Sequence, residues 1–213
     1  MQFIKFLIDF FLHIDKNLVL VIAKYGVLTY GILFFVIFME TGFVVTPFLP
    51  GDSLLFAAGA LAAMGSFNII ILFGLMALAA IVGDTVNYWV GHFLGREVFE
   101  KNSRFFKKKY LEEAEAFYAK HGGAAILLGR FVPIVRTFVP FVAGVSEMSY
   151  GHFITYNIIG GLSWVSLFLF GGFLFGNVPI VKANFEFVVI VIVLISIVPI
   201  LWTMLKKGKK KAE

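Results

Sequence analysis

The sequence contains no cysteine, which excludes disulfide bonds, thiolate nucleophiles and cysteine-ligated clusters. It is also poor in charge: Asp, Glu, Lys and Arg make up 15% of its 213 residues, against about 25% in a soluble globular domain. A soluble protein of this size could not cover its surface with so few charged side chains. Soluble enzymes, nucleic-acid-binding domains and disordered chains are therefore excluded as the main interpretation.

Apolar residues are abundant instead. The chain is 60% hydrophobic, has 27 Phe and a mean hydropathy of +0.94. This composition predicts an integral membrane protein. Since a membrane helix needs about 20 apolar residues, the chain has room for one membrane domain and little else. The net charge of +5 comes from basic residues beside apolar segments, which indicates anchoring to anionic lipid heads and not binding to nucleic acid.

The N-terminal part predicts a surface helix followed by a first span. Residues 1–16 combine a Phe-rich face with a charged face, so we expect an amphipathic helix at the membrane surface, or else the first turns of a longer membrane helix. Asp9 and Asp15 interrupt its apolar residues, which is not typical of a signal peptide. Residues 17–39 form the predicted first span.

A long apolar stretch follows, with only two charged side chains, Asp52 and Asp84, over residues 41–95. It is too long for one span, and its first part contains residues that interrupt helices: Pro47, Pro50 and Gly51. Irregular backbone within a membrane must be covered by protein or line a water-filled cavity. We therefore predict a re-entrant helical hairpin over 46–64, a turn at 65–68 and a second span over 69–94.

The second half repeats this plan. The predicted segments are a charged cytoplasmic surface helix at 103–120, a re-entrant hairpin at 122–146 broken by Pro133 and Pro140, spans at 150–176 and 185–205, and a basic tail at 206–213. The positive-inside rule places the surface helix, the tail and the N-terminus in the cytoplasm. The two hairpins then enter from opposite faces, as in an inverted repeat.

The predicted fold is thus an all-α membrane domain with about four transmembrane helices, two facing re-entrant hairpins and amphipathic surface helices. A weak sequence echo supports the repeat: Phe56-Ala-Ala-Gly59 followed by Met64, against Phe141-Val-Ala-Gly144 followed by Met148. Short sequences of small apolar residues recur by chance in such a chain, so this similarity alone is weak evidence for a repeat.

Five ionisable residues lie within the predicted membrane segments: Glu40, Asp52, Asp84, Arg130 and Arg136. Charges at this depth are costly unless paired or hydrated, and they commonly mark transport pathways. The acids belong to the first half and the arginines to the second. Facing hairpins would bring them together at the middle of the membrane, where transporters with inverted repeats have their sites.

The three acids are candidate proton-coupling groups, and each has a structural alternative. Glu40 is either an interfacial glutamate at a helix end or a carboxylate that takes up a proton. Asp52 follows Pro50-Gly51 and suits the N-cap of the hairpin's second arm, a role compatible with proton binding. For Asp84 a hydrogen bond to Tyr88, or a partner arginine, competes with a direct role.

Arg130 and Arg136 are candidate ligands of a lipid phosphate. Arginine does not lose its proton, and its planar fork binds phosphate through two hydrogen bonds. The alternative is an internal ion pair with Asp52 or Glu40. The four histidines are scattered and no serine has a catalytic context, so we predict no metal site, catalytic residue or cofactor.

Four motifs resemble the DedA family, also described as SNARE-associated or VTT-domain membrane proteins. They occupy residues 40–53, 83–88, 129–136 and 143–153. The resemblance implies an inner-membrane location, two facing re-entrant hairpins and movement of lipids between leaflets, including undecaprenyl phosphate and phospholipids, often linked to the proton motive force. It also implies that the family's essential carboxylates and arginines correspond to Glu40, Asp52, Arg130 and Arg136.

The sequence therefore predicts a proton-linked transporter or flippase for an anionic lipid, with membrane lipids and protons as its partners. A non-transporting membrane factor that supports envelope integrity is the alternative. A lipid phosphatase or transferase is disfavoured, because no nucleophile–histidine or metal constellation is present. The choice of lipid and whether the protein forms a homo-oligomer stay open.

Overall fold

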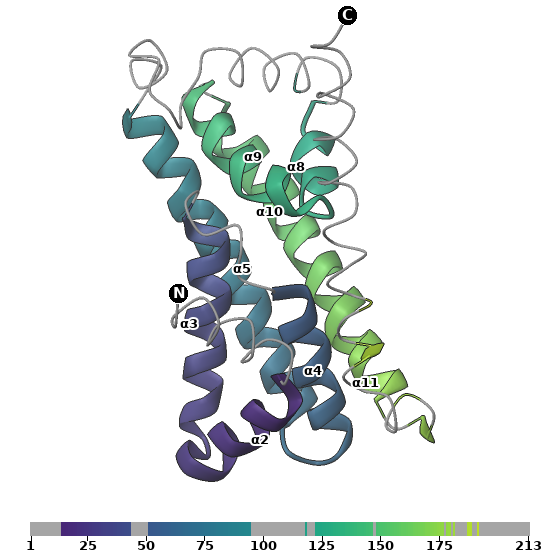
Figure 1. Cartoon of the computed structure of the whole chain (residues 1–213). Coiled ribbons are helices and arrows are strands. Elements are labelled where there is room, and N and C mark those ends of the chain that lie inside the picture. The colour runs from purple at the N-terminus through teal and green to yellow at the C-terminus, as the bar shows by residue number, and fades with distance from the viewer. Residues whose placement is uncertain are drawn as a thin grey trace, which may run out of the picture. The chain divides into compact units, whose positions relative to one another are not determined.

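The computed structural model describes residues 14–43, 51–94, 122–146 and 148–176, with Tyr118 and six further positions after residue 177. Within these residues all regular structure is helical (Figure 1). Several predicted features lie wholly or almost wholly outside the described residues: the amphipathic helix at 1–16, Pro47 and Pro50, the surface helix at 103–120, the span at 185–205 and the tail at 206–213.

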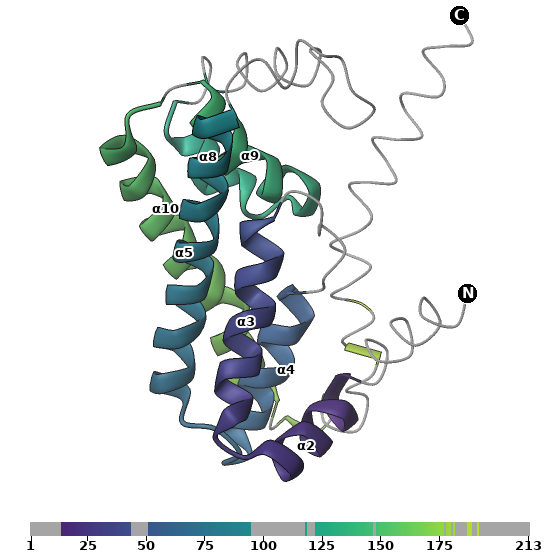
Figure 2. The same cartoon turned by 90° about the vertical axis from the view of Figure 1, so that its left-hand side faces the viewer.

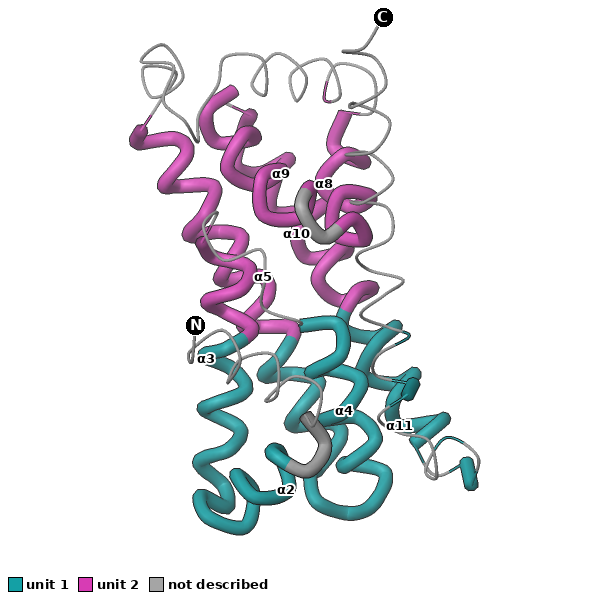
Figure 3. The backbone as a smooth tube through the Cα atoms, viewed as in Figure 1, with its two compact units in different colours: residues 1–36, 49–76, 165–213 teal, residues 37–48, 77–164 magenta. Residues whose placement is uncertain are grey.

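The chain divides into two compact units (Figure 3). Unit 1 consists of residues 1–36, 49–76 and 165–213, and unit 2 of residues 37–48 and 77–164. Each unit therefore combines segments that are distant in the sequence, from both predicted halves of the chain.

Unit 1 begins with α2 (Ile14–Tyr25) and the first part of α3 (Leu28–Gly42), with α2 set beside α4 (Figure 2). The single span predicted over 17–39 is therefore wrong, because two helices meet in this stretch. Gly26 separates them with a φ of +55°, a left-handed conformation that glycine adopts without steric cost. Its N–H donates to the carbonyl of Ile22 at 2.8 Å and closes α2.

Helix α4 (Gly51–Ala63) is the buried centre of unit 1, since residues 51–62 are all buried. Thirteen residues of α-helix rise about 20 Å, which is shorter than the roughly 30 Å core of a bilayer. The helix packs against η1 (Ser166–Phe170), a π-helical segment, and α11 (Gly171–Phe175). Asp52 lies within its first turn rather than before it, where its charge complements the helix dipole.

Helix α5 (Ile69–Leu94) has the bounds that the sequence predicts, and a polar cap at Asn68 begins it. The Asn68 side-chain oxygen accepts hydrogen bonds from the N–H groups of Ile70 at 3.0 Å and Ile71 at 3.2 Å. The N–H of Asn68 itself donates to the Tyr30 hydroxyl at 2.7 Å. This turn therefore joins α3 to α5 within unit 1.

Replacing Asn68 by alanine is expected to lower the free energy of unfolding by about 1 kcal/mol, because the first turn of α5 loses its side-chain acceptor. Thermal unfolding of the detergent-solubilised protein measures this change. Asn68→Ser keeps an acceptor and is expected to lose less. Equal stability of Asn68→Ala and wild type would show that the cap contributes nothing.

In unit 2, two short helices form a helical hairpin within the predicted range 122–146. Helix α8 (Ala124–Gly129) is followed by a turn at 130–132 and by α9 (Pro133–Val145), which packs against α8. Pro133 lies in the first turn of α9, where its missing N–H leaves no bond unmade. The predicted break at Pro140 is wrong, since α9 continues for five residues beyond it. Proline removes one helical hydrogen bond, and the packing around this buried segment compensates for that loss.

Helix α10 (Tyr150–Val165), η1 and α11 form one continuous helical stretch, close to the predicted span at 150–176. By length and composition, this stretch and α5 are both able to cross a membrane. They carry large apolar side chains on their surface, including Phe93 at 81% and Leu174 at 69% exposure. Such exposed apolar side chains suit contact with lipid.

The core of unit 2 packs α9 against α5 and α10. Phe141 and Phe153 are buried, and the ring of Tyr88 stacks on that of Phe153 at 4.4 Å. The Tyr88 hydroxyl donates to the carbonyl of Met148, and the Tyr118 hydroxyl to that of Val139. Burial raises the pKa of Tyr118, so its hydroxyl stays protonated as a donor.

The two units contain the same kind of helix crossing. In unit 1, a Cβ added at Gly59 would lie 2.0 Å from the Leu169 carbonyl oxygen, and one at Gly172 would lie 2.0 Å from the Phe56 oxygen. In unit 2, Gly144 meets the Tyr88 oxygen and Gly91 meets the Phe141 oxygen at the same 2.0 Å. In both crossings each glycine faces the residue three positions before the other glycine. The similar segments Phe56–Gly59 and Phe141–Gly144 thus make equivalent contacts in the two units.

Candidate functional site

Four of the five predicted intramembrane charges gather in unit 2 and are buried there. Glu40 and Asp84 are 0% exposed, Arg130 is 2% and Arg136 is 3%. The fifth, Asp52, belongs to unit 1 and is buried in the first turn of α4. Together the four residues of unit 2 carry two negative and two positive charges.

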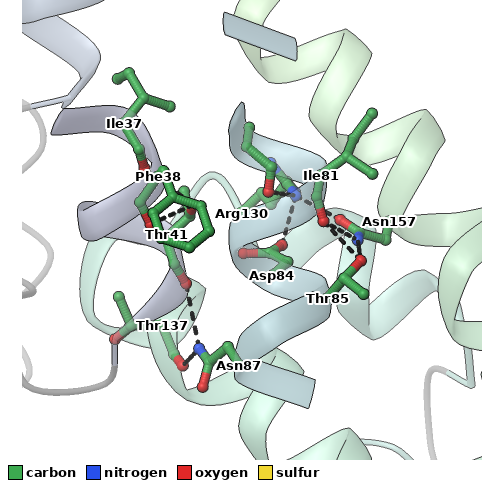
Figure 4. A network of polar contacts seen from close by, with 11 residues as sticks. Ile37, Phe38, Thr41, Ile81, Asp84, Thr85, Asn87, Arg130, Thr137 and Asn157 are labelled. Atoms are coloured by element: carbon green, nitrogen blue, oxygen red, sulfur yellow. Dashed lines mark hydrogen bonds and ion pairs between the residues drawn. The ribbon is translucent and has the colours of Figure 1, made fainter. Parts of the chain in front are cut away.

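The first ion pair joins α5 to the turn after α8. Arg130 Nη2 lies 2.5 Å from Asp84 Oδ2 and 2.5 Å from Asn157 Oδ1 (Figure 4). The carbonyl oxygen of Ala80 is 3.2 Å from the same nitrogen. Ala80 and Asp84 are four residues apart on α5, so they present their oxygens on the same face. Asn157 reaches the same nitrogen from α10.

Two glycines of α10 leave room for the Arg130 side chain. A Cβ at Gly160 would lie 3.1 Å from Arg130 Cδ, and one at Gly161 would lie 3.5 Å from Nη1 and 2.9 Å from Ile81 Cγ1. Asn157, Gly160, Gly161 and Trp164 recur at the spacing of one helix face. All four are buried, so this face of α10 points into unit 2.

The second ion pair joins α3 to α9. Arg136 Nη2 contacts Glu40 Oε1, and the guanidinium carbon lies 4.8 Å from the centre of the Trp164 ring. A cation over the face of an indole ring is attracted by its electrons, most strongly when water is excluded. Arg136 is thus held between a carboxylate from α3 and an aromatic ring from α10.

Asn87 links the helices that carry this second pair. Its Nδ2 donates to the carbonyl of Thr41 at 3.3 Å and to that of Thr137 at 2.7 Å (Figure 4). Thr41 follows Glu40 and Thr137 follows Arg136 in the sequence. The close approach of α3 to α5 depends on Gly83, where a Cβ would lie 3.0 Å from the Phe38 carbonyl oxygen.

Glu40, Asp84, Arg130 and Arg136 form the buried charged cluster of unit 2. Within it, Asp84 and Arg130 can make more hydrogen bonds than the described residues provide. Arg130 Nε and Nη1 and Asp84 Oδ1 are buried and have no hydrogen-bond partner within the described part of the chain. A buried donor without a partner costs about 1–3 kcal/mol, and more for a charged group. Arg130 can therefore donate to an oxyanion or to water without giving up Asp84.

These contacts decide between several alternatives left open by the sequence. Asp84 has an arginine as its partner, while Tyr88 donates to Met148 and not to Asp84. Arg136 forms an ion pair with Glu40. The roles of these residues in proton coupling and phosphate binding stay predictions.

Sequence analysis missed three residues of the cluster: Asn87, Asn157 and Trp164. Two signals were available for Asn157. It is a strongly polar amide in an apolar stretch that has no charged residue, and it shares a helical face with two adjacent glycines. Polar side chains in membrane helices commonly hydrogen-bond to neighbouring helices.

Comparison with known proteins agrees with the motifs. A family model described as the VTT domain matches residues 49–174. Protein DedA of Escherichia coli (strain K12) is 54% identical over 93% of this chain and 92% of its own length. Uncharacterized membrane protein Rv0364 of Mycobacterium tuberculosis is 44% identical over 80% of this chain and 76% of its own. Inner membrane protein YghB of Escherichia coli (strain K12) is 35% identical over 73% and 71%.

No solved structure matches the chain. The VTT domain covers more than half of the chain, and the similarity to protein DedA extends over almost all of it. This chain belongs to the DedA family of VTT-domain membrane proteins.

Proposed function

We propose that this protein is a proton-linked transporter or flippase of the bacterial inner membrane. It moves an anionic lipid, such as undecaprenyl phosphate or a phospholipid, between the two leaflets. The observation that carries the proposal is the buried cluster of unit 2, in which two arginines pair with two carboxylates between apolar helices. Intramembrane charges at such cost are typical of transport pathways.

The chemistry of the cluster suits a phosphate and a proton. Arg130 and Arg136 keep their charge at any physiological pH, whereas Glu40 and Asp84 change charge when they take up a proton. With both carboxylates ionised, the two acids balance the two arginines. Each proton taken up leaves one positive charge uncompensated, and a lipid phosphate can neutralise it. Proton and lipid binding are then thermodynamically linked.

The repeated architecture supports this proposal. Helices α4 and α9 have 13 residues each, too few to cross a bilayer, and α4 is covered on all sides by protein. This is the condition under which a re-entrant segment is tolerated within a membrane. The equivalent glycine crossings of the two units favour an inverted repeat with one re-entrant hairpin in each. Asp52, at the start of α4, is the proposed third proton-coupling group.

The names of relatives support the location. YghB is named an inner membrane protein and Rv0364 a membrane protein. We place this chain likewise in the bacterial inner membrane, with several spans. By the positive-inside rule, its basic tail at 206–213 and its N-terminus lie in the cytoplasm.

Identification of the lipid that co-purifies with the protein tests the proposal. Mass spectrometry of protein extracted in a mild detergent is expected to find an anionic phosphate lipid bound to wild type. The variant Asp84→Asn/Arg130→Gln removes both charges of the first pair but keeps hydrogen-bonding side chains. It is expected to retain at least about tenfold less of this lipid, because a hydrogen bond to a charged group contributes about that factor.

Lys24→Met is the matched control, since it removes an exposed charge from α2 and is expected to leave the bound lipid unchanged. Equal amounts of anionic lipid on wild type and on the double variant would contradict the proposal. That outcome would favour a non-transporting membrane factor, in which the ion pairs serve only to hold the helices together.

A further inference from the structure

Nη2 of Arg130 is surrounded by more hydrogen-bond acceptors than it has protons to donate. Nη2 carries two N–H groups, yet three oxygens surround it: Asp84 Oδ2 and Asn157 Oδ1 at 2.5 Å, and the Ala80 carbonyl at 3.2 Å. The guanidinium is therefore held by one charged acceptor and two neutral ones. Loss of the charged acceptor would leave two acceptors for two protons.

Asn157 is itself fixed in the orientation that offers its oxygen to Arg130. Its Nδ2 donates to the carbonyl of Ile81 at 3.0 Å and to the Thr85 hydroxyl at 3.3 Å, both on α5. Since a guanidinium only donates hydrogen bonds, the amide oxygen must face Arg130 and the amide nitrogen must face α5. The residue is 0% exposed, and its amide stays neutral at every pH.

The other titratable and charged groups near Asp84 come from several elements of unit 2. They are Arg130 in the turn after α8, Arg136 on α9, Glu40 on α3, Tyr118 before α8 and Tyr88 on α5 itself. From α10, the side chain that meets the Asp84–Arg130 pair is the neutral amide of Asn157. A proton on Asp84 therefore changes the charge of the cluster without removing the α10 acceptor.

We propose that Asn157 is a positioning residue that holds Arg130 in place when Asp84 is protonated, so that proton uptake creates a fixed anion-binding site rather than a free arginine. The inference rests on the proposed function and specifies how a proton regulates that site. Arg130 Nε and Nη1, which have no partner within the described residues, then donate to the phosphate of the lipid. The charge gained by the cluster is one unit per proton, which matches the single charge of a phosphodiester.

Binding of dihexanoylphosphatidylglycerol to the full-length protein in a neutral detergent tests this inference. Its phosphodiester keeps one negative charge across the range used, about pH 5.5 to about pH 8, so changes in affinity report on the protein. Wild type is expected to bind it about tenfold more tightly at the lower pH. Asn157→Leu is expected to lose about tenfold in affinity at the lower pH and less than about twofold at the higher pH, where ionised Asp84 still holds Arg130.

Thr155→Val is the matched control, because it removes a hydroxyl from the exposed face of α10 that bonds only within its own helix, to the Gly151 carbonyl. Its affinities are expected to equal those of wild type at both pH values. Dihexanoylphosphatidylcholine, which has no net charge, is expected to show no gain in affinity at the lower pH. If Asn157→Leu does not fold, Asn157→Ser provides the same comparison with a side chain too short to reach Arg130.

The outcomes separate this inference from the proposed function. Equal losses at both pH values would show that Asn157 has only a structural role, and no loss at either pH would show that it has none; both overturn the inference while the proposed function stands. Failure of wild type to bind the anionic probe at either pH would overturn the proposed function and the inference with it.

Discussion

Replacing Arg136 by alanine is expected to abolish lipid movement and to destabilise unit 2 by about 3–5 kcal/mol, because the buried carboxylate of Glu40 would lose the arginine that contacts it. The loss of the guanidinium also removes the cation that lies over the Trp164 ring. Thermal unfolding in detergent measures the stability. The rate at which a fluorescent phosphatidylglycerol crosses between leaflets in proteoliposomes measures transport.

A paired variant separates the two effects. Glu40→Gln/Arg136→Met removes both charges and keeps an apolar side chain of similar length against Trp164. Replacement of a buried ion pair by uncharged side chains is often neutral for stability, so we expect the double variant to unfold close to wild type. Transport is nevertheless expected to fall by at least about tenfold, since one of the two phosphate ligands is missing.

A double variant that unfolds like wild type and transports like wild type would show that the second ion pair has no part in function. A single variant, Arg136→Ala, that unfolds at the same temperature as wild type would contradict the burial of the pair. Lys24→Met, which removes an exposed charge, is expected to change the free energy of unfolding by less than about 0.5 kcal/mol.

The glycine crossings are expected to tolerate no side chain. Gly172→Ala and Gly91→Ala each place a Cβ 2.0 Å from a backbone oxygen, that of Phe56 in unit 1 and that of Phe141 in unit 2. Because backbone cannot move aside as a flexible side chain can, the helices must separate. We expect each substitution to lower the free energy of unfolding by about 1–3 kcal/mol or more.

One other glycine from each of the same two helices provides a matched control. At Gly171, next to Gly172 in α11, and at Gly74 in α5, an added Cβ would meet no atom of another part of the chain within 4 Å. Alanine at these positions is expected to leave the stability unchanged or to raise it by up to about 1 kcal/mol, since alanine favours helix over glycine. Equal effects of Gly171→Ala and Gly172→Ala would contradict the close crossing of α4 and α11.

The scarcity of charge made the site predictable in part. Because ionisable groups are costly in apolar helices, the sequence singled out five residues, and four of them lie together in unit 2. Their pairing was not predictable, since it depends on which helices cross. Asp84 had Tyr88 as an equally good candidate partner within its own helix. Asn157 was not predicted, because its neutral amide lacks the charge that distinguishes the other site residues.

The ends of the helices were likewise predictable only in part. The bounds of α5 were predictable, because a turn with Gly65 and a capping Asn68 precedes an apolar run of span length. The break at Gly26 was not, because the one charge beside it, Lys24, can be tolerated near the end of a span, and only the left-handed φ of Gly26 reveals the break. At Pro140 the sequence predicts a break, because proline usually interrupts a helix, but packing within unit 2 keeps α9 helical.

The coupling of lipid and proton movement in proteoliposomes that contain the purified protein tests the transport role of the buried charges most directly. With an imposed pH gradient, wild type is expected to move a fluorescent phosphatidylglycerol between leaflets faster than without the gradient, and to carry protons in proportion. The stably folded Glu40→Gln/Arg136→Met variant is expected to do neither. Movement of the lipid at the wild-type rate by this variant, with the same response to pH, would contradict a transport role for the buried charges of unit 2.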